Sequence, residues 1–231
     1  KKDEFEVLFE DFNTMADELS STEMLKNDFV SNVSHELKTP LAVIQNYATI
    51  LQSETLSEEE RKEYSERISQ AAGRLSTLVT NILQVNRLEN QKIKPASKPF
   101  NLSEALSRCI LNYDAQMEEK QIDLEVNVDQ NLILNSDENL LDMVWNNLLS
   151  NAVKFTQEGG KISVSVQREG ENAIVTISDN GCGMDADTLR HIFDKFYQGD
   201  TSHATQGNGL GLALAKRIID LLGGSVAVES S

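Results

Sequence analysis

A strict apolar repeat constrains the amino-terminal half of the chain more than any other feature. Its members alternate at spacings of four and three residues: Tyr64, Ile68, Ala71, Leu75, Leu78, Ile82 and Val85. This spacing puts the residues on one stripe of an α-helix, as in helices that pack against one another in coiled coils. Ser57 followed by Glu60 has the spacing of a capping box, so we expect the helix to begin there.

A second helix is expected before it. The stretch from about Glu4 to Leu51 has a similar repeat, and Pro40 within it is expected to bend the helix because proline removes a backbone donor. Leu51 to Ser57 is the expected turn. Two narrow-striped helices predict an antiparallel hairpin, and two hairpins are expected to pair as a four-helix bundle. Packing of the hairpin on the rest of the chain remains an open alternative.

The pattern changes after this helical pair. Lys92 to Pro99 contains two prolines and is the expected linker. Beyond it, helices are expected over 102–119, 138–155 and 210–222, and strands over 122–128, 161–167, 173–178 and 225–228. This mixture predicts an α/β sandwich with helices on one face of a mixed sheet. The fold class is therefore multidomain, α and α+β, with expected segments 1–21, 22–93 and 94–231.

Charge and cysteine content limit the partners. The chain has 231 residues and a net charge of −16, which opposes binding to nucleic acid or to an anionic membrane surface. Cys109 and Cys182 fit no metal-binding spacing and are expected to be free thiols. No apolar run approaches the ~20 residues of a membrane-spanning helix. Both ends fall within patterns, so we expect the chain to be part of a longer protein.

One histidine stands out as a candidate nucleophile. His35 falls between Val33 and Leu37 of the first stripe, so its side chain is expected to face solvent. An exposed imidazole can attack an electrophile when a carboxylate orients its ring, and Glu36 is the nearest carboxylate. Taken alone, an exposed histidine beside a glutamate is usually only solvated.

Polar residues on one predicted helix face form a second candidate site. Asn147, Asn151 and Lys154 are spaced by four and three residues. An amide oxygen can bind Mg²⁺ and a lysine can neutralise phosphate. For any single asparagine, an ordinary polar helix face is the commoner interpretation.

Two glycine-rich stretches flank predicted elements. Asp179–Met184 follows a strand, where a carboxylate could accept the exocyclic amine of adenine and glycines allow close backbone approach. Gly207–Leu212 opens the last helix, where backbone donors favour phosphate. A plain turn and a flexible hinge are the respective alternatives.

The stretch around the candidate nucleophile resembles a known family. Ser34–Leu41 reads S-H-E-L-K-T-P-L and is similar over all eight residues to the phosphoacceptor box of two-component sensor histidine kinases. The resemblance implies that His35 is the phosphoacceptor and Glu36 the general base that aligns its ring. It also implies that Thr39 helps to place a water for dephosphorylation of the partner.

Four further stretches resemble the ATP-binding boxes of the same family, in family order. The likeness implies a nucleotide site made of Asn147, Asn151, Lys154, Asp179, Gly181, Gly183, Lys195, Phe196, Gly207, Gly209, Leu210 and Gly211. Within it, Asp179 would recognise adenine and Asn151 would be the Mg²⁺ ligand. Many members carry an arginine where this chain has Gln198, which leaves Lys154 and Lys195 as the nearest phosphate cations. Residues 198–206 would form the mobile ATP lid.

Together the boxes imply a HisKA-type dimerisation and phosphoacceptor domain followed by a Bergerat-type HATPase_c domain. Such a protein is an ATP- and Mg²⁺-dependent homodimeric histidine kinase that autophosphorylates on His35. It then passes the phosphoryl group to an aspartate of a response-regulator receiver domain, and it can also act as that regulator's phosphatase. Asp3–Met15 resembles the end of a HAMP linker, which implies that the chain is the cytoplasmic portion of a bacterial membrane receptor.

Two alternatives remain open. One is a degenerate kinase, a dimeric binding module that signals through its coiled coil without catalysis. The other is an ATPase of the same superfamily that works as a chaperone or DNA-repair clamp, although the acidic charge opposes a DNA clamp.

Overall fold

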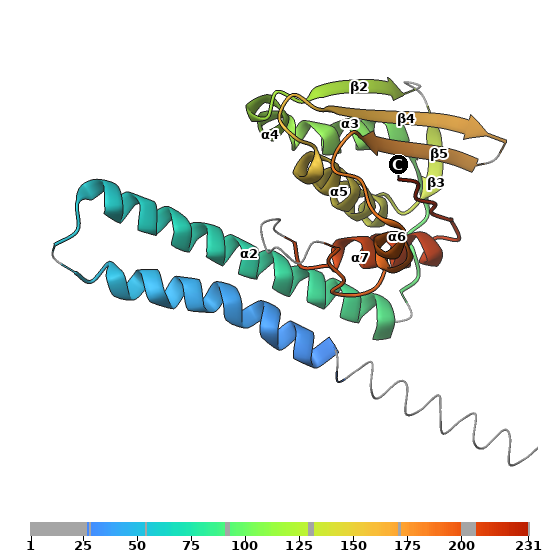
Figure 1. The fold of residues 1–231 in the computed structure, drawn as a ribbon. Helices are drawn as coiled ribbons and strands as arrows, with labels where there is room; N and C mark the ends of the chain where they lie inside the picture. Colours follow the sequence, from blue (N-terminus) through green and yellow to red (C-terminus); the bar gives the residue numbers. More distant parts are fainter. Residues whose placement is uncertain are drawn as a thin grey trace, which may run out of the picture. The chain divides into compact units, whose positions relative to one another are not determined.

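The computed structural model describes residues 27, 29–53, 55–90, 93–128, 132–170, 172–199 and 207–230. The chain divides into two compact units, Lys1–Thr80 and Asn81–Ser231 (Figure 1). The HAMP-like stretch lies outside the described residues, and so do residues 200–206 of the expected lid.

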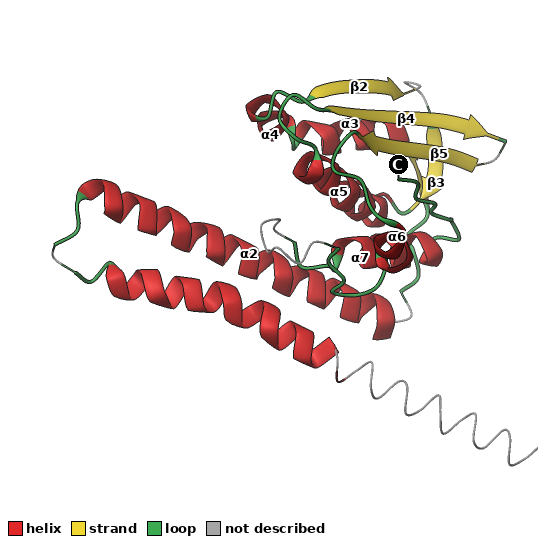
Figure 2. Ribbon diagram, in the orientation of Figure 1, coloured by secondary structure: helices red, strands yellow, loops and turns green. Residues whose placement is uncertain are grey.

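The first unit is a helical hairpin (Figure 2). A helix over 29–50 continues through Pro40, and α2 (Glu58–Asn90) follows after a short connection. The predicted capping box is confirmed. The Ser57 N–H donates to Oε2 of Glu60 at 2.9 Å, and the Glu60 N–H donates to Oγ of Ser57 at 3.2 Å. This reciprocal pair satisfies two donors at the start of the helix.

The apolar stripe of α2 faces inward as predicted. Ala71, Leu78 and Val85 are buried, and the other four members are half-buried. Aromatic contact joins the two helices of the hairpin, since the rings of Tyr47 and Tyr64 lie 5.2 Å apart. At its end α2 belongs to the second unit, where Val85 joins that unit's core.

The second unit contains a mixed three-stranded sheet in the order β2-β4-β5. Its strands are β2 (Asp123–Val128), β4 (Lys161–Glu169) and β5 (Asn172–Asp179). β2 runs parallel to β4, and β5 runs antiparallel to it. The predicted hairpin of β4 and β5 is confirmed, as is the strand predicted over 122–128, which is β2.

A small antiparallel pair, β1 (Lys98–Asn101) and β3 (Ile133–Ser136), was not predicted. The linker expected to reach Pro99 therefore ends earlier, and Pro99 lies within β1. Proline is tolerated there because a two-stranded sheet consists of edge strands only. β3 was not predicted because a strand of four residues is too short to show a periodic pattern.

Helices pack against this scaffold, namely α3 (Leu102–Leu111), α4 (Asp114–Glu119), α5 (Glu138–Phe155), α6 (Ala186–His191) and α7 (Gly211–Leu221). The single helix expected over 102–119 was wrong, because the chain breaks at Asn112 and Tyr113. The break turns the Tyr113 side chain toward α5, where its hydroxyl donates to the Asn146 carbonyl at 3.1 Å.

The strand expected over 225–228 is also absent from the described part of the chain. Gly223, with a φ of +76°, ends the α7 turn, and the residues after it form no ladder. Instead the segment is held by a side chain, since the Met184 N–H donates to Oγ of Ser230 at 2.7 Å.

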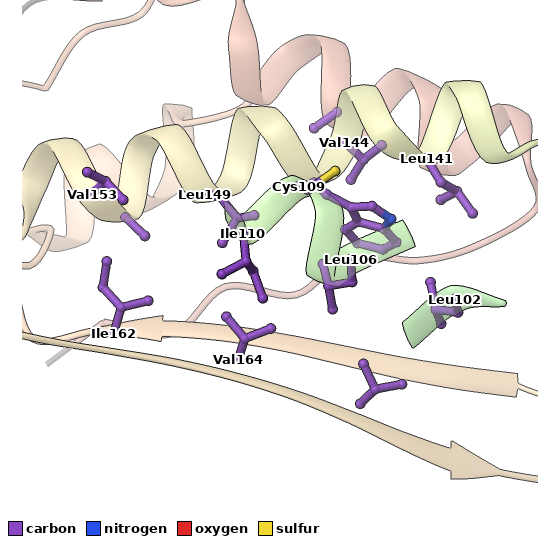
Figure 3. Packing of buried hydrophobic residues seen from close by; sticks show 14 of the residues in the cluster. Leu102, Leu106, Cys109, Ile110, Leu141, Val144, Leu149, Val153, Ile162 and Val164 are labelled. Atoms are coloured by element: carbon purple, nitrogen blue, oxygen red, sulfur yellow. The ribbon is translucent and has the colours of Figure 1, made fainter. Parts of the chain in front are cut away.

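The core of the second unit lies between β4 and the helices α3 and α5 (Figure 3). Ile162 and Val164 of β4 are fully buried and point toward the helices, where Leu106 and Leu149 lie. The intervening residues of β4 are polar and less buried, so alternation along the strand separates the two faces. The predicted placement of helices on one face of the sheet is confirmed.

Candidate functional site

His35 lies exposed on the helix 29–50, between the half-buried Val33 and Leu37. The Thr39 hydroxyl donates to the His35 carbonyl at 3.4 Å, which fixes Thr39 one turn further along the same face. No hydrogen bond joins Glu36 to the His35 ring within the described residues. The reason is geometric, since the side chains of neighbouring helix residues point about 100° apart. The exposure expected for His35 is confirmed, and the roles of these three residues stay predictions.

Three polar residues of α5 share one half-buried face, as expected for Asn147, Asn151 and Lys154. Nδ2 of Asn147 donates to the Met143 carbonyl at 2.7 Å, which orients its amide. The Asn151 carboxamide makes no hydrogen bond in the part of the chain that the structure describes. Its oxygen is therefore uncommitted, a property that suits a ligand of a hard cation.

Lys154 is a partly desolvated cation on this face. Its Nζ lies 4.4 Å from the centroid of the Phe155 ring, and burial lowers the pKa of the Lys154 ammonium. An ammonium in such surroundings gains from an arriving anion, because the anion offsets the desolvation of the charge. The role of Lys154 in binding phosphate stays a prediction.

The start of α7 packs directly against this polar face. A β-carbon at Gly211 would lie 2.6 Å from Oδ1 of Asn147, and one at Gly207 would lie 2.8 Å from Nζ of Lys154. Glycine at both positions lets the backbone approach these side chains without displacing them. Two stretches about fifty residues apart, both predicted to bind phosphate, are thereby brought together.

The segment before α7 is tied to the residues that follow α6. Phe196, with a φ of +64°, donates its N–H to the Gly209 carbonyl at 2.9 Å. Gly209 also has a positive φ, of +62°, and a β-carbon there would lie 2.5 Å from the Phe196 carbonyl carbon. Leu210 is fully buried and anchors the beginning of α7.

Gln198 and Lys195 have partners of their own. Nε2 of Gln198 donates to the Gly207 carbonyl at 3.1 Å, so its amide binds backbone in this structure. The Lys195 ammonium forms an ion pair with Glu89 at the end of α2. The proposed contact of Lys195 with phosphate stays a prediction, and it would compete with this carboxylate.

Asp179 ends β5 and is exposed. Its Oδ1 accepts the Gly181 N–H at 2.9 Å, which closes a tight turn and leaves Oδ2 for another donor. A β-carbon at Gly181 would lie 2.6 Å from the Phe155 carbonyl, so this loop rests against the end of α5. Gly183 has a φ of +67°, a conformation that favours glycine.

Two residues that position this region were missed by the sequence analysis. Oδ1 of Asn180 accepts the Lys161 N–H at 2.7 Å and holds the turn after β5 to the start of β4. Lys120 binds carbonyls at the end of α5. An asparagine in a turn signals side-chain bonding to backbone, whereas no sequence pattern links Lys120 to residues over thirty positions away.

The cysteines and acidic residues that the structure describes form no cluster suited to a metal ion. Both cysteines are free, and burial raises the pKa of the Cys109 thiol to about 11, so it is an inert core residue. Among the described residues no group of three or more His, Cys, Asp or Glu side chains could hold a metal ion. No helix in this part of the chain is long and apolar enough to cross a membrane.

Known families match both units. Residues 25–91 match the His Kinase A (phospho-acceptor) domain, and residues 136–231 match the family described as Histidine kinase-, DNA gyrase B-, and HSP90-like ATPase. The heme sensor protein HssS of Staphylococcus saprophyticus is 32% identical over 230 residues, covering 100% of this chain and 49% of HssS. The sensor-like histidine kinase SenX3 of Mycobacterium tuberculosis is 30% identical over 210 residues, covering 90% and 51%. The chain thus spans about half the length of these relatives.

Solved structures of histidine kinases share the fold. ShkA in complex with AMPPNP has a TM-score of 0.64 at 27% identity, with 90% of this chain and 43% of that chain covered. ThkA in complex with the response regulator protein TrrA has a TM-score of 0.71 at 20% identity, with 97% and 62% covered. A phosphoacceptor domain followed by an ATPase domain, together with these relatives, shows that the chain belongs to the sensor histidine kinases of two-component systems.

Proposed function

We propose that this chain is the catalytic part of a protein-histidine kinase that moves the γ-phosphoryl group of ATP onto His35. One observation carries the proposal: the predicted phosphate-binding residues of α5 and the glycines that open α7 converge in space. A β-carbon at Gly207 or Gly211 would crowd the side-chain end of Lys154 at 2.8 Å or of Asn147 at 2.6 Å. Backbone N–H groups at a helix start beside a desolvated ammonium make a site for anions.

ATP is proposed to bind with its adenine at the turn after β5. Oδ2 of Asp179 would accept the exocyclic amine, and the glycines on either side of Cys182 would let the ring approach the backbone. Lys154 would neutralise phosphate charge. The AMPPNP in the ShkA structure supports a nucleotide in this family's ATPase domain.

Mg²⁺ is proposed as the metal, and the carboxamide of Asn151 fits it because its oxygen has no competing hydrogen bond among the described residues. When bound, the metal would supply charge neutralisation at the phosphates. The other residues of this chain would provide binding and orientation, which account for most of the catalysis expected in phosphoryl transfer.

In the proposed transfer, a ring nitrogen of His35 forms a bond to the γ-phosphorus while the bond from that phosphorus to the bridging oxygen breaks. ADP leaves with the bond's electron pair. Glu36 would orient the ring and stabilise the developing positive charge. Thr39 would help to place a water that attacks the phosphorylated partner and releases inorganic phosphate, a separate dephosphorylating activity.

The phosphoryl group is proposed to pass from His35 to an aspartate of a response-regulator receiver domain. The complex of ThkA with a response regulator supports a partner of this kind. A second copy of the chain is the proposed partner of the hairpin, because apolar side chains remain exposed on both of its helices. Val30 is 55% exposed, Leu41 45% and Val79 42%.

The intact protein is proposed to continue upstream into transmembrane and sensor segments, which would make this chain the cytoplasmic portion of a bacterial membrane receptor. The HAMP-like stretch Asp3–Met15 and the greater length of the relatives support this extension.

The test is to incubate the chain with γ-labelled ATP and Mg²⁺ and to map the phosphorylated residue by mass spectrometry. We expect label on His35, lost in acid and kept in base. The His35→Gln variant should incorporate none while binding ATP normally. Stable label on that variant would refute the acceptor assignment.

The same assay separates the alternatives. A degenerate binding module would incorporate no label and release no phosphate. An ATPase of another kind would release phosphate and leave the protein unlabelled.

A further inference from the structure

Lys120 makes three hydrogen bonds to the carboxyl end of α5. Its Nζ donates to the carbonyls of Val153 at 2.7 Å, Lys154 at 3.0 Å and Thr156 at 2.9 Å. An ammonium has three N–H donors and no acceptor, so this side chain is saturated. The half-buried charge also lies at the negative end of the helix dipole, where a cation is favoured.

The backbone of Lys120 is itself held in place. Lys120 caps α4, and the chain then reverses through Gln121, which has a φ of +52°. The Gln121 N–H donates to the Glu118 carbonyl at 3.0 Å, and the Ile122 N–H donates to the Met117 carbonyl at 2.9 Å. These are the two bonds of a Schellman motif, and the accompanying apolar contact fits the burial of Met117 and Ile122.

Lys120 binds two of the last four carbonyls of α5. The Ala152 carbonyl accepts the N–H of Thr156 at 3.0 Å and its hydroxyl at 2.7 Å. The next two carbonyls are those bound by Lys120. The last, that of Phe155, is the one against which Gly181 rests. Without Lys120, two partly buried acceptors would lose their partner beside the nucleotide loop.

The same lysine also holds the chain that leaves α5. The Gly159 N–H donates to the Lys120 carbonyl at 2.9 Å, and the Asp123 N–H donates to the Gly160 carbonyl at 2.8 Å. Lys120 thus binds the helix end with its side chain and the following turn with its backbone. Lys154 lies in the last turn of α5, and Gly181 lies against the Phe155 carbonyl of the same turn.

We infer that Lys120 is a positioning residue for the nucleotide site. It holds the last turn of α5 and so fixes the position of Lys154 relative to the loop after Asp179. Lys120 reaches the site only through the backbone that it binds, and it touches no nucleotide. This inference rests on the proposed function. Small displacements of binding groups are enough to cost large factors in phosphoryl transfer.

The first measurement uses no nucleotide. Hydrogen exchange of the whole chain is compared between the parent and Lys120→Met, which keeps the length of the side chain and removes its donors. We expect faster exchange in the last turn of α5 and in residues 156–161, and unchanged exchange in the hairpin. Parent-like exchange at these amides would overturn the inference whatever the protein binds.

The second measurement is the ATP dependence of autophosphorylation, well below the melting temperature of each variant. Lys120→Met should raise KM for ATP about tenfold, and Lys120→Arg, which restores donors and charge, should recover most of it. A purely stabilising role would reduce the active fraction and lower kcat alone. A KM within about twofold of the parent overturns the inference.

Lys98→Met is the matched control. Lys98 is exposed on β1 and belongs to neither α5 nor the loop after Asp179, so the same substitution there should leave KM unchanged. If Lys120→Met does not fold, Lys120→Gln is measured against the same two criteria. If Lys120→Met exchanges faster than the parent at these amides but the parent binds no ATP, the proposed function is refuted. The role of Lys120 in holding the end of α5 is then still supported.

Discussion

Gly211 lies so close to Asn147 that a β-carbon on the glycine would come within 2.6 Å of the asparagine's Oδ1. This contact joins the first turn of α7 to the polar face of α5. Both elements were predicted to bind phosphate, and the absence of a side chain at one position allows them to meet.

Substitution Gly211→Ala should therefore disturb the site. The added methyl would displace the Asn147 amide or the start of α7, and we expect the Kd for ATP to rise by about tenfold or more. Equilibrium binding of a fluorescent ATP analogue with Mg²⁺ measures the effect. Gly73→Ala is the control, because nothing lies within 4 Å of a β-carbon there and the helix should gain about 0.5–1 kcal/mol in stability.

Asp179→Asn should abolish adenine recognition without unfolding the domain. Asparagine keeps an oxygen to accept the Gly181 N–H, but it presents an amide donor where the adenine amine would also donate. We expect the Kd for ATP to rise about 100-fold or more, with an unchanged melting temperature. Asp123→Asn, at an exposed position of β2, serves as the control. An affinity within a few-fold of the parent would remove Asp179 from the site.

Lys154→Met should stabilise the empty protein and weaken nucleotide binding. Burial lowers the pKa of Lys154 below its ordinary value, so the unfolded chain binds the proton more tightly than the folded one. The cost to folding is fully present at neutral pH. It is relieved as pH rises through the window between the lowered folded pKa and the ordinary lysine value.

Thermal unfolding against pH measures this difference. At neutral pH the Lys154→Met variant should melt at or above the parent's temperature, and the gap should shrink toward high pH. ATP should raise the melting temperature of the parent more than that of the variant, because the variant has lost the Lys154 charge that would neutralise phosphate. A variant that melts lower at neutral pH and gains equally from ATP contradicts both parts.

Leu78→Ala should destabilise the hairpin. Leu78 is only 3% exposed in the stripe of α2, and truncation of a buried leucine costs about 2–5 kcal/mol. Ser76, two residues earlier on α2, is exposed and polar, so Ser76→Ala should change the free energy of unfolding by less than about 1 kcal/mol. Chemical denaturation followed by circular dichroism compares the two. Equal losses would mean that the stripe does not face the core.

Local patterns were enough to predict much of this protein. The 4-3 stripe, the capping box of Ser57 and Glu60, and the bounds of α5 follow from periodicity and from side chains that bind backbone within a few residues. The stripe, the cap and the helix bounds depend on interactions between residues close in the sequence, which a linear pattern records. The candidate site residues came instead from the resemblance of short runs to the boxes of a known family, and their roles stay predictions.

Tertiary structure decided the rest. The helix expected to continue past Tyr113 ends there, and the Tyr113 hydroxyl donates to the Asn146 carbonyl on another helix. Lys120 binds the end of α5, and Lys195 pairs with Glu89 across more than a hundred residues. Each of these contacts joins groups that are brought together only when separate elements pack, and the free energy of satisfying a partly buried donor or carbonyl then outweighs the local preference.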